Sequence, residues 1–327
     1  MRIRQQIINA INEFLQKNEY LRFDSPILTP SACEGTTTLF PVPYLSSWPA
    51  FANEAAAGKP ENVPSWTNPP KDKPYVFLSQ SGQLYLEAAI YSFGRVYDFG
   101  PTFRAEKSKT KRHLTEFWMM DAEAAFMEYE ELLKSEENLV FHIINQVLKN
   151  CLKELEILER NIGPLKAIKL PFERLSYKDT VAKLKALGSD IKYGEDLGND
   201  DETLLMTHFK QPLFVMKFPA SFKAFYFKRD AQDQDLTLSV DLLVPEGYGE
   251  IAGGGQREDD LKTLLKRLKE QNLDEKDYSW YVDLRKYGSV PHSGFGLGLE
   301  RLVAWICGLE HIRETIPFPR TIYRFSP

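Results

Sequence analysis

Glycine recurs at every second position near the C-terminal end of the chain, at Gly294, Gly296 and Gly298. If this stretch forms a strand, the three glycines share one face, which then carries no side chains. A flat ligand could lie directly on that backbone, although close packing against another element is an alternative. Arg301 follows at the start of a predicted helix, where its guanidinium could cover a base or bind a phosphate.

A second group of residues surrounds a basic loop. Arg104 and Glu106 alternate onto one face of a predicted strand, and His113 and Phe117 lie on the strand that returns. An arginine can neutralise a phosphate, a glutamate can accept from an exocyclic amine, and an aromatic ring can stack on a base. Arg112 ends the loop, which is the one dense basic patch of the sequence. The pattern predicts a nucleotide site, with a solvated hairpin tip as the alternative.

Two carboxylates mark a possible metal site. Asp241 and Glu250 lie on neighbouring predicted strands. They could share a magnesium ion, because this hard cation prefers carboxylate and phosphate oxygen. The glycines 253–255 again leave a bare surface, and Arg257 follows directly. Two solvated carboxylates at strand ends would be the alternative.

Hydrophobic periodicity predicts the helices and strands that position these residues. The first is a helix over 2–17 with one buried face. We expect further helices at 83–93, 129–159, 176–187, 256–271, 274–286 and 300–307, and strands at 76–78, 95–104, 113–121, 213–217, 224–228, 236–243 and 249–254. Helices and strands are interspersed without a regular strand-helix-strand order. The sequence therefore predicts an α+β fold, a mostly antiparallel sheet flanked by helices, and not a Rossmann layout.

We expect one catalytic domain over residues 1–327 with two additions. Residues 41–74 are rich in proline and lack periodicity, which predicts a surface loop or lid. Residues 160–235 form a candidate inserted module.

Composition sets broad limits. The 327 residues are 43% hydrophobic and 27% charged, with a net charge of -5, so any contact with nucleic acid needs a local basic patch. Cys33, Cys151 and Cys307 are too scattered for a disulfide framework or a zinc cluster. The sequence shows no signal peptide and no apolar run long enough to span a membrane. We expect a cytoplasmic protein without membrane contact.

Several stretches, in this order, resemble the signature motifs of class II aminoacyl-tRNA synthetases. Ser25-Pro-Ile-Leu-Thr-Pro30 resembles the dimerisation motif, Phe-Arg-x-Glu with His-x-x-x-Phe resembles the second motif, and Gly-x-Gly-x-Glu-Arg resembles the third. Residues 31–40, 78–87, 104–117 and 287–301 are most similar to the asparaginyl-tRNA synthetases of the aspartyl/asparaginyl/lysyl subgroup. Family members carry an N-terminal OB-fold domain that binds the anticodon. We expect this chain to lack that domain, because it starts at the first catalytic helix.

The resemblance implies a two-step reaction. Asparagine reacts with ATP to give asparaginyl-adenylate and pyrophosphate, and the asparaginyl group then passes to the 3′ end of tRNA(Asn). It also implies Mg2+ bound by Asp241 and Glu250, ATP as a substrate, contact with the acceptor end of the tRNA, and a homodimer.

The resemblance also assigns roles to single residues. Arg104 is expected to be catalytic, holding the α-phosphate and the reacting carboxylate. The expected ATP-binding residues are Arg104, Glu106 at the adenine amine, Arg112 and His113 near the β- and γ-phosphates, and Phe117 and Arg301 on the two faces of the adenine. The expected amino-acid-binding residues are Glu34, Ser81 and Gln83 at the α-ammonium group, and Glu87 and Arg257 at the side-chain amide.

Two other functions remain open. The first is a tRNA-independent asparagine synthetase that activates aspartate and transfers it to ammonia. Glu87 argues against it, because its carboxylate would oppose a second carboxylate, and aspartate-specific relatives place a lysine where this chain has Leu86. The second is a non-catalytic binding module, which the intact ATP motifs oppose. Lys107-Ser-Lys-Thr resembles a class I loop, but the His-Ile-Gly-His partner of that loop is missing from the sequence.

Overall fold

A computed structural model describes residues 1–33, 39–42, 76–105 and 111–326. Glu34, Glu106 and nearly all of the proline-rich segment 41–74 lie outside these ranges, so the predictions for them are not addressed by the structure.

An eight-stranded sheet forms the centre of the described chain, in the order β1-β5-β6-β11-β10-β9-β8-β7. Its strands are β1 (Leu21–Arg22), β5 (Arg95–Phe103), β6 (Glu116–Ala125), β7 (Glu173–Ser176), β8 (Leu213–Met216), β9 (Ser239–Val244), β10 (Gly249–Gln256) and β11 (His292–Gly298). Only the two edge pairs, β1 with β5 and β7 with β8, are parallel. A second, three-stranded sheet has the order β2-β4-β3, from β2 (Leu28–Thr29), β3 (Phe40–Pro41) and β4 (Phe77–Leu78). The predicted α+β class with a mostly antiparallel sheet is confirmed.

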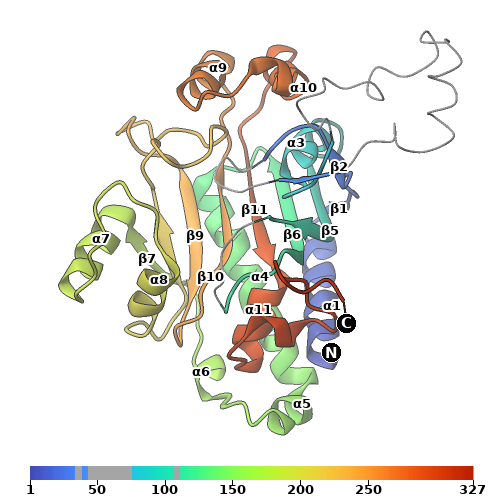
Figure 1. Cartoon of the computed structure of the whole chain (residues 1–327), viewed down its shortest axis with the longest axis vertical. Coiled ribbons are helices and arrows are strands. Elements are labelled where there is room, and N and C mark those ends of the chain that lie inside the picture. The colour runs from blue at the N-terminus through green and yellow to red at the C-terminus, as the bar shows by residue number, and fades with distance from the viewer. Residues whose placement is uncertain (34–38, 43–75, 106–110, 327) are drawn as a thin grey trace, which may run out of the picture.

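Helices lie on the sheet and at its ends (Figure 1). Those in the described ranges are α1 (Arg2–Lys17), α3 (Gln83–Phe93), α4 (Tyr129–Asn150), α5 (Leu152–Ile157), α6 (Gly163–Lys166), α7 (Tyr177–Ala186), α8 (Asn199–Met206), α9 (Leu261–Glu270), α10 (Ser279–Lys286) and α11 (Leu299–Cys307), with 3-10 turns η4 (Glu275–Tyr278) and η5 (Ile312–Thr315). None of them is long and apolar enough to cross a membrane.

One face of the sheet carries the main apolar core. Apolar side chains of α1, α4 and α11 pack there against the alternate residues of β9 and β11, among them Val240, Leu242, Phe295 and Leu297. Alternation along each strand then directs Asp241 and the glycines 294, 296 and 298 to the opposite face. The face that lacks α4 is thus the one on which polar groups and bare backbone gather.

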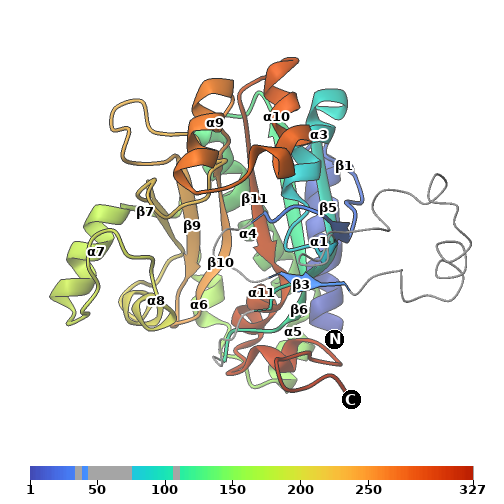
Figure 2. The same cartoon turned by 45° about the horizontal axis from the view of Figure 1, so that its top comes forward.

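Two peripheral groups of elements extend the sheet. β7, α7, α8 and β8 lie at one edge, around a separate apolar cluster that includes Tyr177, Leu205 and Phe218. α9 and α10 lie next to each other at one end of the sheet, with α10 close to α3 (Figure 2). Phe225 and Tyr281 belong to the apolar cluster beneath them.

Several sequence predictions differ from the structure at element boundaries. The helix predicted over 129–159 ends at Asn150 and resumes as α5, and the one predicted over 256–271 starts only at Leu261, because β10 continues to Gln256. The predicted helix 274–286 begins as the 3-10 turn η4.

The strand predicted over 224–228 is wrong. Phe225, Tyr226 and Phe227 are all buried. In a regular strand that is covered on one face, consecutive side chains would alternate between buried and exposed. The segment instead forms turns with isolated bridges to neighbouring strands.

Candidate active site

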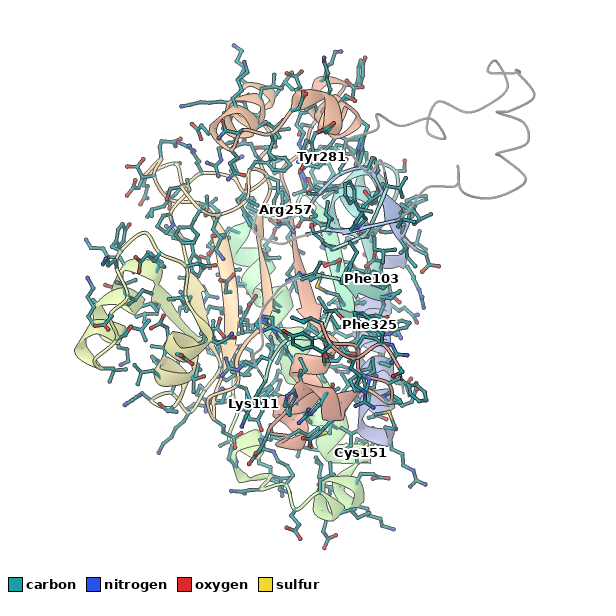
Figure 3. All side chains as sticks on the ribbon, viewed as in Figure 1. Phe103, Lys111, Cys151, Arg257, Tyr281 and Phe325 are labelled. Atoms are coloured by element: carbon teal, nitrogen blue, oxygen red, sulfur yellow. The ribbon has the colours of Figure 1, made fainter. Side chains whose placement is uncertain are left out.

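A cavity of about 700 Å3 opens on the sheet face that lacks α4. The predicted residues that line it are Ser81, Gln83, Arg104, Arg112, His113, Phe117, Asp241, Glu250, Arg257 and Arg301. Arg257 lies near one end of the sheet and Lys111, which precedes Arg112, near the other (Figure 3). The structure thus brings four separate sequence stretches into one site.

The glycines of β11 leave less open surface for a ligand than the sequence suggested. A Cβ at Gly294 would lie 2.1 Å from the Glu123 side chain, and one at Gly296 would lie 2.6 Å from Asp121 Oδ1. These two carboxylates come from the paired strand β6 and fill the space above the glycines. The alternative of close packing therefore holds at Gly294, whereas Gly296 and Gly298 also line the cavity.

Three arginines that were predicted to bind ATP line the cavity: Arg104, Arg112 and Arg301. The Arg104 guanidinium lies 5.3 Å from the centre of the Phe117 ring, so a cation that could bind phosphate adjoins a ring that could stack on a base. Arg112 is bound by Glu202 Oε2 at 3.2 Å, by the Thr203 hydroxyl and by the backbone oxygen of Gly247. Glu202 and Thr203 belong to α8, so the peripheral group of elements contributes contacts to the site.

Asp241 and Glu250 converge above Gly253. One oxygen of each lies within 3.3 Å of the position that a Cβ would take at this glycine. Lys223 Nζ binds Asp241 at 2.8 Å, and Arg301 binds Glu250 Oε2 at 2.8 Å. Burial and the charge of Glu250 raise the pKa of Asp241 to about 7, although Lys223 opposes this shift.

The two carboxylates suit a hard cation. In the described ranges, no group of three or more His, Cys, Asp or Glu side chains could hold a metal ion by itself. A magnesium ion at Asp241 and Glu250 would therefore complete its shell with nucleotide phosphate and water, which is the usual arrangement for this ion.

Three of the residues that were predicted to bind the amino acid, Ser81, Gln83 and Arg257, also line the cavity. Ser81 and Gln83 stand at the start of α3. Asp121 Oδ2 accepts hydrogen bonds from the Ser81 hydroxyl at 2.9 Å and from the Gly82 amide at 2.8 Å. These bonds fix the turn that directs Gln83 into the cavity. Arg257 is held by Glu123 Oε1 at 2.5 Å.

Glu87 lies elsewhere than the sequence suggested. It is fully buried and is not among the residues that line the cavity. Its carboxylate instead contacts Gln83, Tyr281, Arg285 and His292. Glu87 therefore stands behind Gln83, which lines the cavity, and its expected contact with a substrate amide stays a prediction.

Several side chains of the site were missed by the sequence analysis. They are Asp121, Glu123, Glu202, Lys223 and Arg285. Alternation from Phe117 could have placed Asp121 and Glu123 on the strand face that meets the cavity. Glu202 and Arg285 sit on helices distant in sequence, and no local pattern of residues predicts their contacts.

This fold and site define a class of protein. The chain belongs to the family of tRNA synthetases class II (D, K and N), which matches residues 1–322. It is 50% identical over 327 residues to proteins named asparagine–tRNA ligase in Pelotomaculum thermopropionicum and Desulforamulus reducens, and covers 70% of each. The resemblance stated from the motifs is confirmed.

Solved structures support the same relationship. The structure of asparaginyl-tRNA synthetase from Pyrococcus horikoshii complexed with asparaginyl-adenylate is similar at a TM-score of 0.90 and 44% identity, over 100% of this chain and 69% of that chain. The Entamoeba histolytica asparaginyl-tRNA synthetase in complex with asparaginyl-adenylate is similar at a TM-score of 0.84 and 33% identity, over 100% of this chain and 68% of that chain.

Proposed function

We propose that this chain is an asparagine–tRNA ligase. It activates L-asparagine with ATP to asparaginyl-adenylate and transfers the asparaginyl group to the 3′ end of tRNA(Asn). The observation that carries the proposal is that Arg104 and Arg301 line the same cavity as Gln83 and Arg257. Relatives that match this chain over its full length, and over 70% of their own, are named for this reaction, and two similar solved structures are complexed with asparaginyl-adenylate.

The chemical step needs little covalent participation by the protein. A carboxylate oxygen of asparagine attacks the α-phosphorus of ATP, a P–O bond forms, and pyrophosphate leaves with the electrons of the broken bond. Negative charge accumulates at the α-phosphate in the transition state, so a cation fixed at this position lowers the activation free energy most. Arg104 is the residue that we assign to this role, since it lines the cavity beside Phe117.

The remaining nucleotide contacts follow from the same cavity. Phe117 and Arg301 would cover the two faces of the adenine, and Arg112 and His113 would meet the terminal phosphates. Arg301 and Arg112 are bound to Glu250 and Glu202. Nucleotide binding would therefore exchange these ion pairs for contacts with phosphate or base. A magnesium ion held by Asp241 and Glu250 would neutralise phosphate charge when bound.

Asparagine would bind with its α-ammonium group at Ser81 and Gln83 and its side-chain amide at Arg257. Arg257 can donate to the amide oxygen, but it could equally attract the carboxylate of aspartate. Arg257 is already paired with Glu123, and Glu87 Oε1 lies 4.0 Å from its Nε. The charge of Glu87 offsets that of Arg257, and Glu123 occupies part of its hydrogen-bonding capacity, which favours the neutral substrate. The asparagine synthetase alternative, which requires aspartate, is therefore disfavoured.

We further propose a homodimer that acts in the cytoplasm. The segment that resembles the dimerisation motif exposes Ile27 and Leu28, and Leu21, shortly before it in the chain, and Phe93, at the end of α3, are also exposed. Exposed apolar side chains grouped in this way indicate a contact surface. We also propose that residues 160–235 are a module inserted into one catalytic domain spanning 1–327.

Amino-acid-dependent exchange between ATP and pyrophosphate tests the proposed activity. Asparagine should drive the exchange and aspartate should not. Aspartate-driven exchange alone would contradict the proposal and favour an asparagine synthetase. Aminoacylation of tRNA(Asn) transcript with labelled asparagine then tests the second step.

A further inference from the structure

Two residues of α10 that do not line the cavity contact Glu87. Tyr281 and Arg285 stand one helical turn apart and are both buried. The Tyr281 hydroxyl donates to Glu87 Oε2 at 2.6 Å, and Arg285 Nη2 donates to the same oxygen at 2.5 Å. His292 Nε2 lies 3.0 Å from it. Figure 3 shows Tyr281 and Arg257 toward the same end of the sheet.

Arg285 is itself held in place by the fold. Its Nε donates to the backbone oxygen of Glu258 at 2.9 Å, and its guanidinium lies 4.2 Å from the centre of the Tyr281 ring. Glu258 follows Arg257 in the sequence, at the end of β10. Arg285 therefore links α10 both to Glu87 and to the backbone beside Arg257.

The second oxygen of Glu87 reaches the residues that line the cavity. Gln83 Nε2 donates to Glu87 Oε1 at 3.0 Å, and Arg257 Nε lies 4.0 Å from the same oxygen. A carboxylate only accepts hydrogen bonds, so the NH2 group of Gln83 must face Glu87. The amide oxygen of Gln83 then remains for other donors, and it accepts a weak bond from Cys33 Sγ at 3.9 Å. An oxygen in this orientation suits a substrate ammonium group.

The charge of Glu87 depends on its neighbours. Burial alone opposes ionisation, but Arg285, His292 and Arg257 together hold the pKa of Glu87 well below its usual value. The other ionisable groups around it are Tyr281 on α10 and Glu123 on β6. Without Arg285, the buried carboxyl group would retain its proton to a higher pH. A protonated Glu87 could donate to Gln83, and the amide would no longer have one fixed orientation.

We propose that Arg285 is a specificity-determining positioning residue: it holds the Glu87 carboxylate in place, so that Glu87 can orient Gln83 and offset Arg257 in the asparagine pocket. This inference rests on the proposed function. Arg285 does not line the cavity, and its effect on the substrate passes through Glu87.

Kinetics of Arg285→Met test the inference. In pyrophosphate exchange, KM for asparagine should rise about tenfold or more and KM for ATP should change less than about twofold, because only the amino-acid pocket is altered. The ratio of kcat/KM for asparagine over aspartate should fall at pH 6. It should recover partly toward pH 8.5, as Glu87 loses its proton. The wild-type ratio should depend on pH less strongly.

Lys286→Met is the matched control. It removes the same charge from the next position of α10, where the side chain is exposed, and it should behave as wild type. Arg285→Lys keeps the charge and should lie between wild type and Arg285→Met.

A double variant covers the case in which Arg285→Met fails to fold. Glu87→Gln with Arg285→Met removes both buried charges, so no charge is left unpaired. This variant should fold and should lose the preference for asparagine at every pH. A folded Arg285→Met with wild-type KM for asparagine and wild-type preference would overturn the inference. So would a double variant that keeps the preference. If the wild-type chain shows no asparagine-driven exchange, the proposed function fails instead.

Discussion

Arg104 and Arg301 both line the cavity, but they are expected to serve different stages of the reaction. Arg104 should act mainly in the transition state, where charge concentrates at the α-phosphate. Arg104→Ala should therefore lower kcat by about a hundredfold or more, with a smaller change in KM for ATP. Steady-state pyrophosphate exchange measures both constants.

Arg301→Ala should weaken ATP binding more evenly in the ground state and the transition state. KM for ATP should rise while kcat changes less, since stacking on a base is the same in both states. Equal and small effects of the two substitutions would contradict the assigned roles.

Asp98 belongs to a buried pair whose ionisation opposes folding. It pairs with Asp121 across β5 and β6, and burial together with the charge of Asp121 raises the pKa of Asp98 to about 8. The folded chain thus keeps a proton that the unfolded chain releases above about pH 4. This pair should therefore make the fold less stable as the pH rises from about 4 to about 8.

Asp98→Asn should remove this dependence. We expect a gain in stability of on the order of 1 kcal/mol or more at pH 8 and no gain at pH 4, measured by urea unfolding at both values. A variant that is equally stabilised at both pH values would show that the ionisation of Asp98 is not the cause.

At the scale of elements, the glycines of β11 differ in what surrounds them. A Cβ at Gly294 would meet the Glu123 side chain at 2.1 Å and a backbone oxygen at 2.3 Å, whereas one at Gly298 would meet nothing nearer than 3.8 Å. Gly294→Ala should therefore lower the free energy of unfolding by about 1–3 kcal/mol, and Gly298→Ala by much less. Urea unfolding of the two variants gives the comparison. Similar losses in both would contradict the packing described here.

The same strand shows how far the sequence could predict the site. The spacing of Gly294, Gly296 and Gly298 identified the element and its bare face. It did not reveal that Glu123 and Asp121 fill part of that face, because this depends on the pairing of β6 with β11. Local patterns thus predicted ten of the residues that line the cavity, but not Asp121, Glu202 or Lys223. The second layer of contacts, such as Arg285 on Glu87, arises from long-range packing.

Element types were predicted better than their ends. The antiparallel pairing of β5 with β6 follows from two alternating stretches joined by a polar loop. The parallel edge strands β1 and β7 were missed because they have only two and four residues, too few for a periodic pattern. The aromatic run 225–227 was wrongly predicted as a strand. All three side chains are buried, so the run does not show the alternation of buried and exposed residues that identifies a half-buried strand.

At the scale of the whole molecule, the exposed apolar residues near the dimerisation motif predict self-association. The chain should sediment as a dimer at micromolar concentration, and Leu28→Asp should shift it toward the monomer, because a charge would be buried in the contact. Analytical ultracentrifugation measures both. Phe126→Asp is a suitable control, since this exposed side chain lies outside the motif. A wild-type monomer with full activity would contradict the proposed dimer.

The central claim is that one cavity activates asparagine and rejects aspartate. The most direct measurement is ATP–pyrophosphate exchange by the wild-type chain with asparagine, with aspartate and with no amino acid. We predict exchange with asparagine and a kcat/KM for aspartate lower by about a thousandfold, a difference that corresponds to about 4 kcal/mol of selectivity. Exchange driven by aspartate and not by asparagine would contradict the account.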